Sequence, residues 1–169
     1  MRHNSKSLSA ICTIMMLWSV LVMAAPAHAT PPDQLYTLNC WGCHQPHAQG
    51  IPGSVPRLSN SMGYFLHLPE GRAYLAEVPG VASAPLSDDE IARVLNWMLL
   101  TFSRAQIPKD FVPYTADEIH RYRQHKLVNV TAARRRLAAK LMSMGFEISR
   151  DGQQPSDSAR NTSRAQAKP

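Results

Sequence analysis

Apolar residues recur at helical spacing between residues 91 and 102, the most regular stretch of the chain. The stripe consists of Ile91, Val94, Leu95, Met98, Leu99 and Phe102. Positions three or four apart share one face of an α-helix. Ser87 and Glu90 come directly before the stripe in the capping-box pattern, in which each side chain satisfies the other residue's backbone amide. The pattern predicts a capped amphipathic helix that starts near residue 88.

Shorter helices are predicted before this one. Residues 33–39 are typical of a short helix, and residues 62–76 of one or two more. Pro79-Gly80 ends that stretch. Two glycines and two prolines in residues 50–58 exclude a regular element there and predict a loop.

Two further helices are predicted towards the C-terminus. A second capping-box pattern, Thr115 with Glu118, predicts a helix that runs to about Leu127. Residues 131–144 carry aligned apolar residues and are followed by Gly145, a common helix stop. Because every predicted element is helical, we expect an all-α fold.

The first 29 residues resemble a secretory signal peptide. They combine a basic start, an apolar run from Leu8 to Ala25 and the small-residue pattern Ala27-His28-Ala29. The alternative is a retained membrane anchor, but the run is short for a span and ends in small residues and Pro26. We therefore expect export and cleavage near Ala29.

Cleavage would leave about 140 residues, enough for one modest domain. The removed segment carries Arg2, Lys6 and no acidic residue, so the formal charge falls from +6 to +4. This mild excess suits an acidic protein partner and is too weak to indicate nucleic acid. Cys12 leaves with the segment, and Cys40 and Cys43 are then the remaining cysteines. No thiol is left over for a disulfide.

Both remaining cysteines belong to the sequence Cys40-Trp41-Gly42-Cys43-His44. Two cysteines two residues apart, followed at once by histidine, form the attachment pattern of c-type haem. Each thiol can form a thioether to one vinyl group of the haem, and His44 can ligate the iron. The motif predicts one covalent haem c held by Cys40 and Cys43, with His44 as the iron ligand.

Two other interpretations of the cysteine pair are weaker. A zinc site needs two more ligands at suitable spacing, and His47 and His67 are the only nearby additions. A redox-active pair of the thioredoxin type is preceded by a strand, whereas no β-branched run precedes Cys40.

Three features outside the motif match known positions of one family. Tyr36 lies four residues before Cys40, Val94 and Trp97 lie on the capped helix, and Pro56-Arg57-Leu58 follows His44 by twelve residues. In this order and spacing, the chain resembles a class I (monohaem) cytochrome c over about residues 33–103.

The resemblance implies a small helical fold around the haem, in which two helices cross. Tyr36 would then meet the face that carries Val94 and Trp97. It also implies that the carbonyl of Pro56 accepts a hydrogen bond from Nδ1 of His44, which would orient the imidazole and raise its basicity.

One family feature is missing. The family usually places a distal methionine ligand on the loop before its C-terminal helix, and here residues 78–86 contain no methionine, histidine or lysine. Met62, His67 and Met98 are candidates for the distal position, and an open site is a further possibility. The distal ligand therefore stays unassigned from the sequence.

The resemblance implies a periplasmic one-electron carrier rather than an enzyme. Its partners would be periplasmic redox proteins, with a dehydrogenase as donor and a terminal oxidase or another cytochrome as acceptor. The alternative function is a haem protein with an open distal site that binds a gas or reacts with peroxide, since a vacant axial position admits small molecules.

We divide the mature chain into a haem domain (30–108), a basic helical extension (109–146) and a polar tail (147–169) expected to be disordered. Between Arg121 and Lys140 the extension carries seven basic residues, which are Arg121, Arg123, Lys126, Arg134, Arg135, Arg136 and Lys140. No acidic residue lies among them. They predict either a solvated helix face or a docking surface for an acidic redox partner or anionic lipid headgroups.

Overall fold

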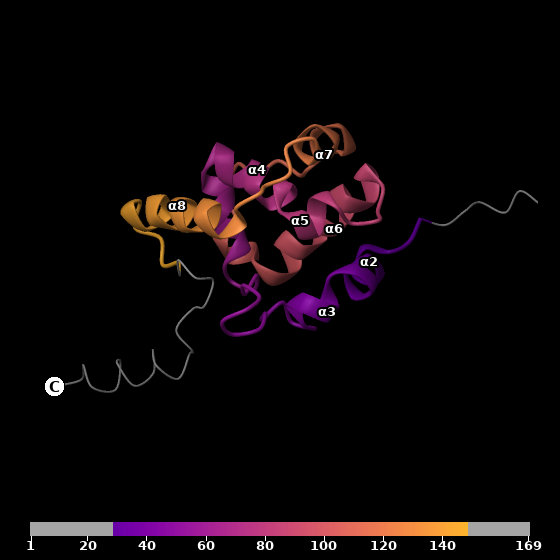
Figure 1. The fold of residues 1–169 in the computed structure, drawn as a ribbon, viewed down its shortest axis with the longest axis horizontal. Helices are drawn as coiled ribbons and strands as arrows, with labels where there is room; N and C mark the ends of the chain where they lie inside the picture. The colour runs from indigo at the N-terminus through magenta and orange to yellow at the C-terminus, as the bar shows by residue number, and fades with distance from the viewer. Residues whose placement is uncertain (1–28, 149–169) are drawn as a thin grey trace, which may run out of the picture.

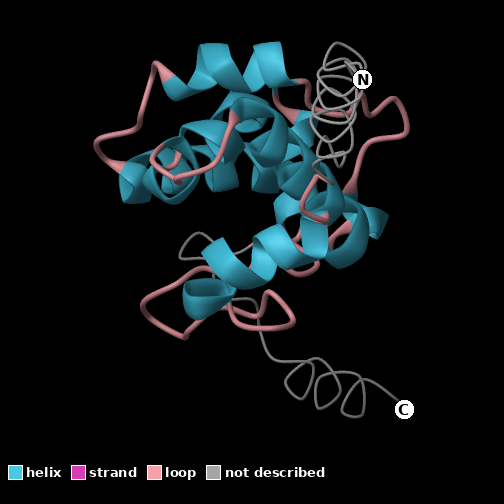
Figure 2. Cartoon of the chain, turned by 90° about the vertical axis from the view of Figure 1, so that its right-hand side faces the viewer, coloured by secondary structure: helices cyan, strands magenta, loops and turns pink. Residues whose placement is uncertain are grey.

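A computed structural model describes residues 29–148 of the chain. The helices of this range are α2 (Pro32–Asn39), α3 (Trp41–His44), η1 (Met62–His67), α4 (Pro69–Glu77), α5 (Pro79–Ala82), α6 (Asp88–Phe102), η2 (Arg104–Gln106), α7 (Ala116–Arg123) and α8 (Val130–Ser143). Loops join them, and the described residues contain no strand (Figure 2). The predicted all-α fold is confirmed.

Two of the expected segments fall partly or wholly outside this range. The signal peptide, apart from Ala29, and the tail from residue 149 onward are not among the described residues. Within residues 29–148, no helix combines the length and apolar character needed to span a membrane.

Helix α6 forms the centre of the fold, and its start confirms the first capping box. The Ser87 hydroxyl accepts from the Glu90 amide at 3.2 Å, and the Ser87 amide donates to the Glu90 carboxylate at 2.9 Å. The stripe predicted from the sequence is buried from Ile91 to Leu99. Helix α6 lies between α2 and α7 (Figure 1) and contacts both.

An aromatic cluster joins α2 to α6. The ring centre of Tyr36 lies 5.5 Å from that of Trp97 and 5.1 Å from that of Phe102. The Tyr36 hydroxyl donates to the carbonyl of Gln45 at 2.7 Å. The crossing of the two helices therefore fits the resemblance, and it ties the chain just after His44 to the centre of the fold.

The second capping pattern behaves differently from the first. The Thr115 hydroxyl accepts from the Glu118 amide at 3.3 Å, but the Glu118 carboxylate pairs with Arg72 on α4 instead of reaching back. Helix α7 also ends at Arg123 rather than near Leu127, because the Leu127 amide donates to the Glu77 carbonyl at 3.0 Å. The Glu118 carboxylate and the Leu127 amide thus bind partners on α4, although the capping rule and a longer helix would pair them within α7.

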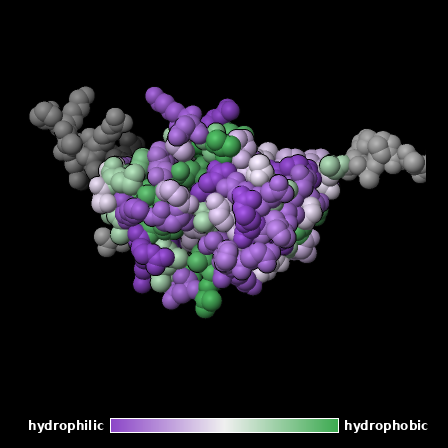
Figure 3. Space-filling view, turned by 90° about the horizontal axis from the view of Figure 1, so that it is seen from above, coloured by the Kyte–Doolittle hydropathy of each residue, from purple (hydrophilic) through white to green (hydrophobic). Residues whose placement is uncertain are grey.

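The C-terminal extension packs on the rest of the protein. Helix α7 contacts α4 and α6, and α8 contacts η1 and α4. Ile119, Leu137 and Leu141 are buried in these contacts, and Ile148 is only 5% exposed. The chain thus remains packed two residues into the stretch expected to be a tail. Elsewhere, apolar side chains show on the face in Figure 3 as separate patches among hydrophilic ones.

Candidate functional site

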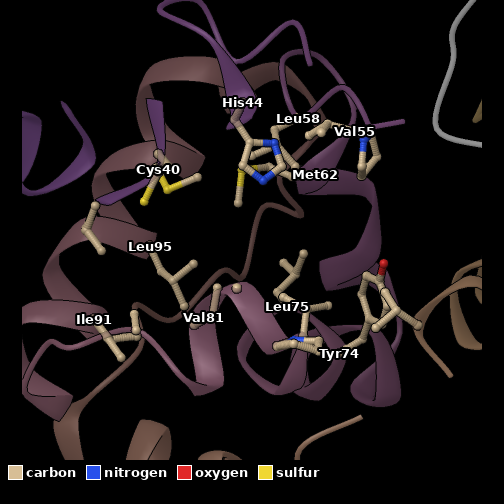
Figure 4. A pocket seen from close by; sticks show the side chains of 18 of the residues that line it. Cys40, His44, Val55, Leu58, Met62, Tyr74, Leu75, Val81, Ile91 and Leu95 are labelled. Atoms are coloured by element: carbon tan, nitrogen blue, oxygen red, sulfur yellow. The ribbon is translucent and has the colours of Figure 1, made fainter. Parts of the chain in front are cut away.

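A cavity of about 250 Å³ lies at the heart of the molecule, between the cysteine motif and α6. Its walls come from the loop 54–58, from α4 and α5, from α6 and from the first turn of α8. The lining is almost entirely apolar and, among the described residues, contains no aspartate or glutamate. Figure 4 shows Cys40 and His44 at one end of the cavity, with Leu75, Val81 and Leu95 across from them.

The single turn of α3 presents the motif to this cavity. The amide of His44 donates to the carbonyl of Cys40 at 2.9 Å, so the two residues lie one turn apart on the same side, and both line the cavity. Cys43 is exposed and does not line it. Gln45 ends the turn with a positive φ of 67°. The structure therefore brings together Cys40 and His44, and places Cys43 beside them at the surface.

His44 is held as a neutral ring. Burial lowers the pKa of its imidazole, and the nearby carbonyl of Pro56 opposes that effect only in part. Nδ1 is buried and makes no hydrogen bond of acceptable geometry within the described residues. The Pro56 carbonyl is thus close to the predicted position, without the hydrogen bond being formed. A neutral imidazole is the form that ligates iron.

The position of Pro56 depends on a glycine. Gly50 has a φ of +70°, and a Cβ at this position would lie 2.4 Å from the Val55 carbonyl oxygen. The Gly50 amide donates to the His44 carbonyl at 3.0 Å. Only a residue without a side chain lets the loop 50–58 fold this closely onto the motif. The sequence predicted a loop here, and the structure explains its first glycine.

The two other interpretations of the cysteine pair lose support. Burial, and secondarily the charge of Cys43, raises the pKa of the Cys40 thiol to about 11. Thiol exchange needs a thiolate, which this raised pKa disfavours. Among residues 29–148, no group of three or more histidine, cysteine or acidic side chains is placed to hold a metal ion.

Of the three distal candidates, His67 lies away from the cavity and does not line it. A ring nitrogen of His67 lies 3.0 Å from the Gln106 carbonyl oxygen, and its ring packs 4.4 Å from that of Phe146. Met62 and Met98 do line the cavity, but Figure 4 shows Met62 beside His44 rather than opposite it.

Residues 78–86, where the distal ligand of the family is missing, line the cavity with apolar side chains, and an arginine binds their backbone carbonyls. Pro79 begins α5 directly after the end of α4, and Val81 faces the cavity. Arg123 of α7 donates to the carbonyls of Ala82 and Leu86 at 3.2 and 3.0 Å. The sequence had placed Arg123 on a basic surface. In the structure it fixes the wall of the cavity.

Sequence reasoning also missed a second arginine. Arg134 was assigned to the basic surface, yet it lines the cavity and is 7% exposed. The sequence contains a signal for the burial of Arg134. It stands three residues before Leu137 and seven before Leu141, which puts it on the apolar face of α8.

These residues fit a covalently attached haem. An apolar cavity suits the porphyrin plate, Cys40 lies at its edge, and the neutral imidazole of His44 faces it. Cys43 stands on the same turn and would form the second thioether. The donor set is one imidazole and two thiols from a single five-residue segment.

Comparison with known proteins agrees with this fit. The family described as cytochrome c matches residues 32–101. A cytochrome c-552 of Thermus thermophilus is 33% identical over 144 residues, which cover 73% of this chain and 97% of that protein. A second cytochrome c-552 of the same species is 36% identical over 121 residues, covering 60% of this chain and 92% of that protein. The first match is longer than residues 32–101, so the similarity extends beyond that range.

Proposed function

Because this chain belongs to the cytochrome c family, we propose that it is a periplasmic one-electron carrier between a dehydrogenase and a terminal oxidase or another cytochrome. The family binds haem c through the Cys-x-x-Cys-His motif, which here is Cys40, Cys43 and His44. One observation carries the proposal. The cavity joins Cys40 and a neutral His44 to apolar walls in which the described residues place no acidic side chain.

The residues of the site have separate tasks. Cys40 and Cys43 would hold the haem by two thioether bonds, and the imidazole of His44 would ligate its iron. When bound, the haem supplies the ferric and ferrous states. The apolar walls keep water away, which sets the dielectric around the iron and hence its potential. Among the described residues that line the cavity, His44 is the only histidine, and there is no aspartate, glutamate or lysine. Because His44 would be taken up as an iron ligand, this lining favours electron transfer over acid–base catalysis.

Export is part of this proposal. It rests on the signal-peptide pattern of residues 1–29 and on the attachment of c-type haem outside the bacterial cytoplasm. Both cysteines of the motif would meet the haem only after the chain has crossed the membrane.

A second candidate function rests on the distal side of the cavity. The loop 78–86 contributes apolar groups without a ligand atom, and Met62 lies on the same side as His44. Met98 is then the one other methionine among the described residues that line the cavity, and it would be the candidate for the distal position. If Met98 packs in the core instead, a small molecule can bind the iron.

Visible spectra of the matured protein test the two functions. The oxidised and reduced forms are recorded before and after addition of carbon monoxide, with Met62→Leu and Met98→Leu as paired variants. A carrier gives a low-spin spectrum that ignores carbon monoxide, and loss of this resistance in one variant identifies the ligand. A high-spin spectrum that shifts with carbon monoxide in the unchanged protein overturns the carrier proposal and supports the open site.

We also propose that part of the extension docks a redox partner with an acidic surface. Arg123 and Arg134 are engaged inside the protein, and Lys140 pairs with Glu70. The proposed docking surface is therefore reduced to exposed residues. They are Arg121, Lys126, Arg135 and Arg136.

Charge reversal measures this docking. Arg135→Glu together with Arg136→Glu should slow electron transfer from the cognate dehydrogenase roughly tenfold at low ionic strength, because steering by opposite charges raises association rates by at least that factor. The difference should disappear in high salt. The control is Arg104→Glu with Lys109→Glu, which changes the net charge equally at exposed positions away from α8. Equal slowing by both pairs would contradict a docking surface on α8.

A further inference from the structure

Arg134 is the one arginine or lysine side chain that reaches into the cavity from the described part of the chain. It extends from the first turns of α8 and is buried, with a relative exposure of 7%. Its Nε and Nη2 are buried and have no hydrogen-bond partner within the described residues. The guanidinium carbon stands 5.1 Å from the ring centre of Phe65.

A guanidinium in this position needs an anion. Arginine stays charged in proteins, and a buried charge without a partner costs several kcal/mol. Contact with the face of Phe65 offsets only about 0.5–2 kcal/mol of that cost. Within residues 29–148, the cavity lining contains no aspartate or glutamate to match the charge. The missing anion must therefore come from whatever occupies the cavity.

The unpartnered atoms indicate the shape of that anion. Nε and Nη2 lie along one edge of the guanidinium, and together they donate to the two oxygens of a carboxylate. The same protein shows this arrangement at Arg72, whose Nε and Nη2 donate to Oε1 and Oε2 of Glu118 at 2.6 and 2.7 Å. In Arg134, which lines the cavity, the same two atoms are the ones without a partner within the described residues.

We propose that Arg134 binds a propionate carboxylate of the haem through Nε and Nη2. The proposal rests on haem c being the occupant of the cavity, since that molecule carries its own carboxylates. The apolar plate would then fill the cavity while its acidic edge meets the guanidinium there.

This assigns a part of the cofactor site to the C-terminal extension. Helix α8 lies outside residues 32–101, the range that the family matches. It is held in place by the buried Leu137 and Leu141 and by the ion pair of Lys140 with Glu70. The extension thus both packs against the haem domain and completes the pocket of the haem.

Substitution of Arg134 in the full-length holoprotein tests the proposal. Arg134→Gln is compared with Arg135→Gln and Arg136→Gln, which remove the same charge from exposed positions of the same helix. Two readouts are used: the resonance Raman bending band of the propionates, and the midpoint potential at pH 8. Arg134→Gln should shift the Raman band and lower the potential, because loss of a nearby positive charge favours ferric iron.

The expected change in potential corresponds to about a tenfold rise in the ferric-to-ferrous ratio at a fixed potential, or about 59 mV for a one-electron couple. Both controls should leave the band in place and move the potential much less. Arg134→Lys keeps the charge but loses the fork of donors, so it should shift the Raman band while largely keeping the potential.

A Raman band and a potential in Arg134→Gln that match those of the two controls would overturn the proposal. If Arg134→Gln yields no folded holoprotein, Arg134→Lys decides, and an unmoved band overturns it. Failure of the cofactor assignment looks different, because the unchanged protein would then carry no covalent haem.

Discussion

Replacing His44 by alanine should move the midpoint potential by on the order of 0.1 V, because axial ligands set haem potentials over roughly 0.8 V. The imidazole is buried against the loop of Pro56 and is kept neutral by that burial. In the described residues, no other histidine lines the cavity. His44→Ala therefore has no second imidazole at the cavity that could ligate the iron in place of His44.

The matched control is His47→Ala. His47 lies three residues further along the chain, is exposed and does not line the cavity, so its removal should leave the spectrum and the potential unchanged. Free imidazole added to His44→Ala should restore the spectrum of the unchanged protein in part. If the two variants behave alike in a redox titration followed by visible absorption, His44 is not the iron ligand.

Glu118→Gln should lower the free energy of unfolding by about 3 kcal/mol at pH 7, as expected when one partner of a buried ion pair is removed. The Glu118 and Arg72 side chains are only 15% and 20% exposed. The guanidinium also lies 4.1 Å from the ring centre of Tyr114 and donates to the Val112 carbonyl at 2.8 Å. Neutralising Glu118 leaves the positive charge of Arg72 among these groups without a counterion.

Denaturant unfolding at several pH values checks the same pair. Burial, the largest single effect, raises the pKa of Glu118. The hydrogen bonds and charge of Arg72, with smaller contributions from hydrogen bonds of Tyr122 and Thr115, together outweigh burial and hold the pKa below its ordinary value of 4.5. A group with a lowered pKa stabilises the fold fully above its unfolded pKa, and this stability is lost as the pH falls through the folded pKa. The unchanged protein should therefore lose stability more steeply below about pH 4.5 than Glu118→Gln does.

Asp89→Asn serves as the control for this prediction. Asp89 also pairs with an arginine, Arg93 at 2.8 Å, but its side chain is 67% exposed. Its loss should cost no more than about 1 kcal/mol. Parallel pH curves for the unchanged protein and Glu118→Gln, or equal losses in the two variants, would show that the Arg72 pair does not hold α7 to α4.

The pair matters for the site because α7 carries Arg123. Arg123 holds the carbonyls of Ala82 and Leu86, and these belong to the loop that walls the cavity opposite His44. Loosening α7 should therefore disturb the distal wall. The extension supports the proposed haem pocket at two places, through Arg123 on the loop and through Arg134 inside the cavity.

Several features followed from the sequence because their causes are local. The capping box of Ser87 and Glu90 needs only a spacing of three residues, and the stripe of α6 needs only the helical period. The motif from Cys40 to His44 is equally local, since a single turn places its first cysteine and its histidine on one side. Tyr36 and Trp97 met as expected because the order of the two helices matches the family.

The errors came where a long-range partner competed with a local rule. Glu118 was placed in a capping box, but Arg72 lies 46 residues away in the sequence and binds its carboxylate more strongly than a backbone amide would. The sequence makes His67 a candidate ligand, but the carbonyl of Gln106 and the ring of Phe146 hold it outside the cavity. Neither partner can be read from the sequence around these residues.

The sequence by itself determined a covalent haem, its two attachment cysteines and a helical fold to surround it, and it predicted His44 as the proximal ligand. The tertiary structure decided which charged residues lie at the cavity. In the sequence, Arg123, Arg134 and Arg135 are equivalent members of one basic stretch. In the structure, Arg123 supports a loop, Arg134 is buried at the cavity and Arg135 faces solvent. The reason is physical, because the environment of a charge depends on what packs around it, and that depends on contacts between residues far apart in the chain.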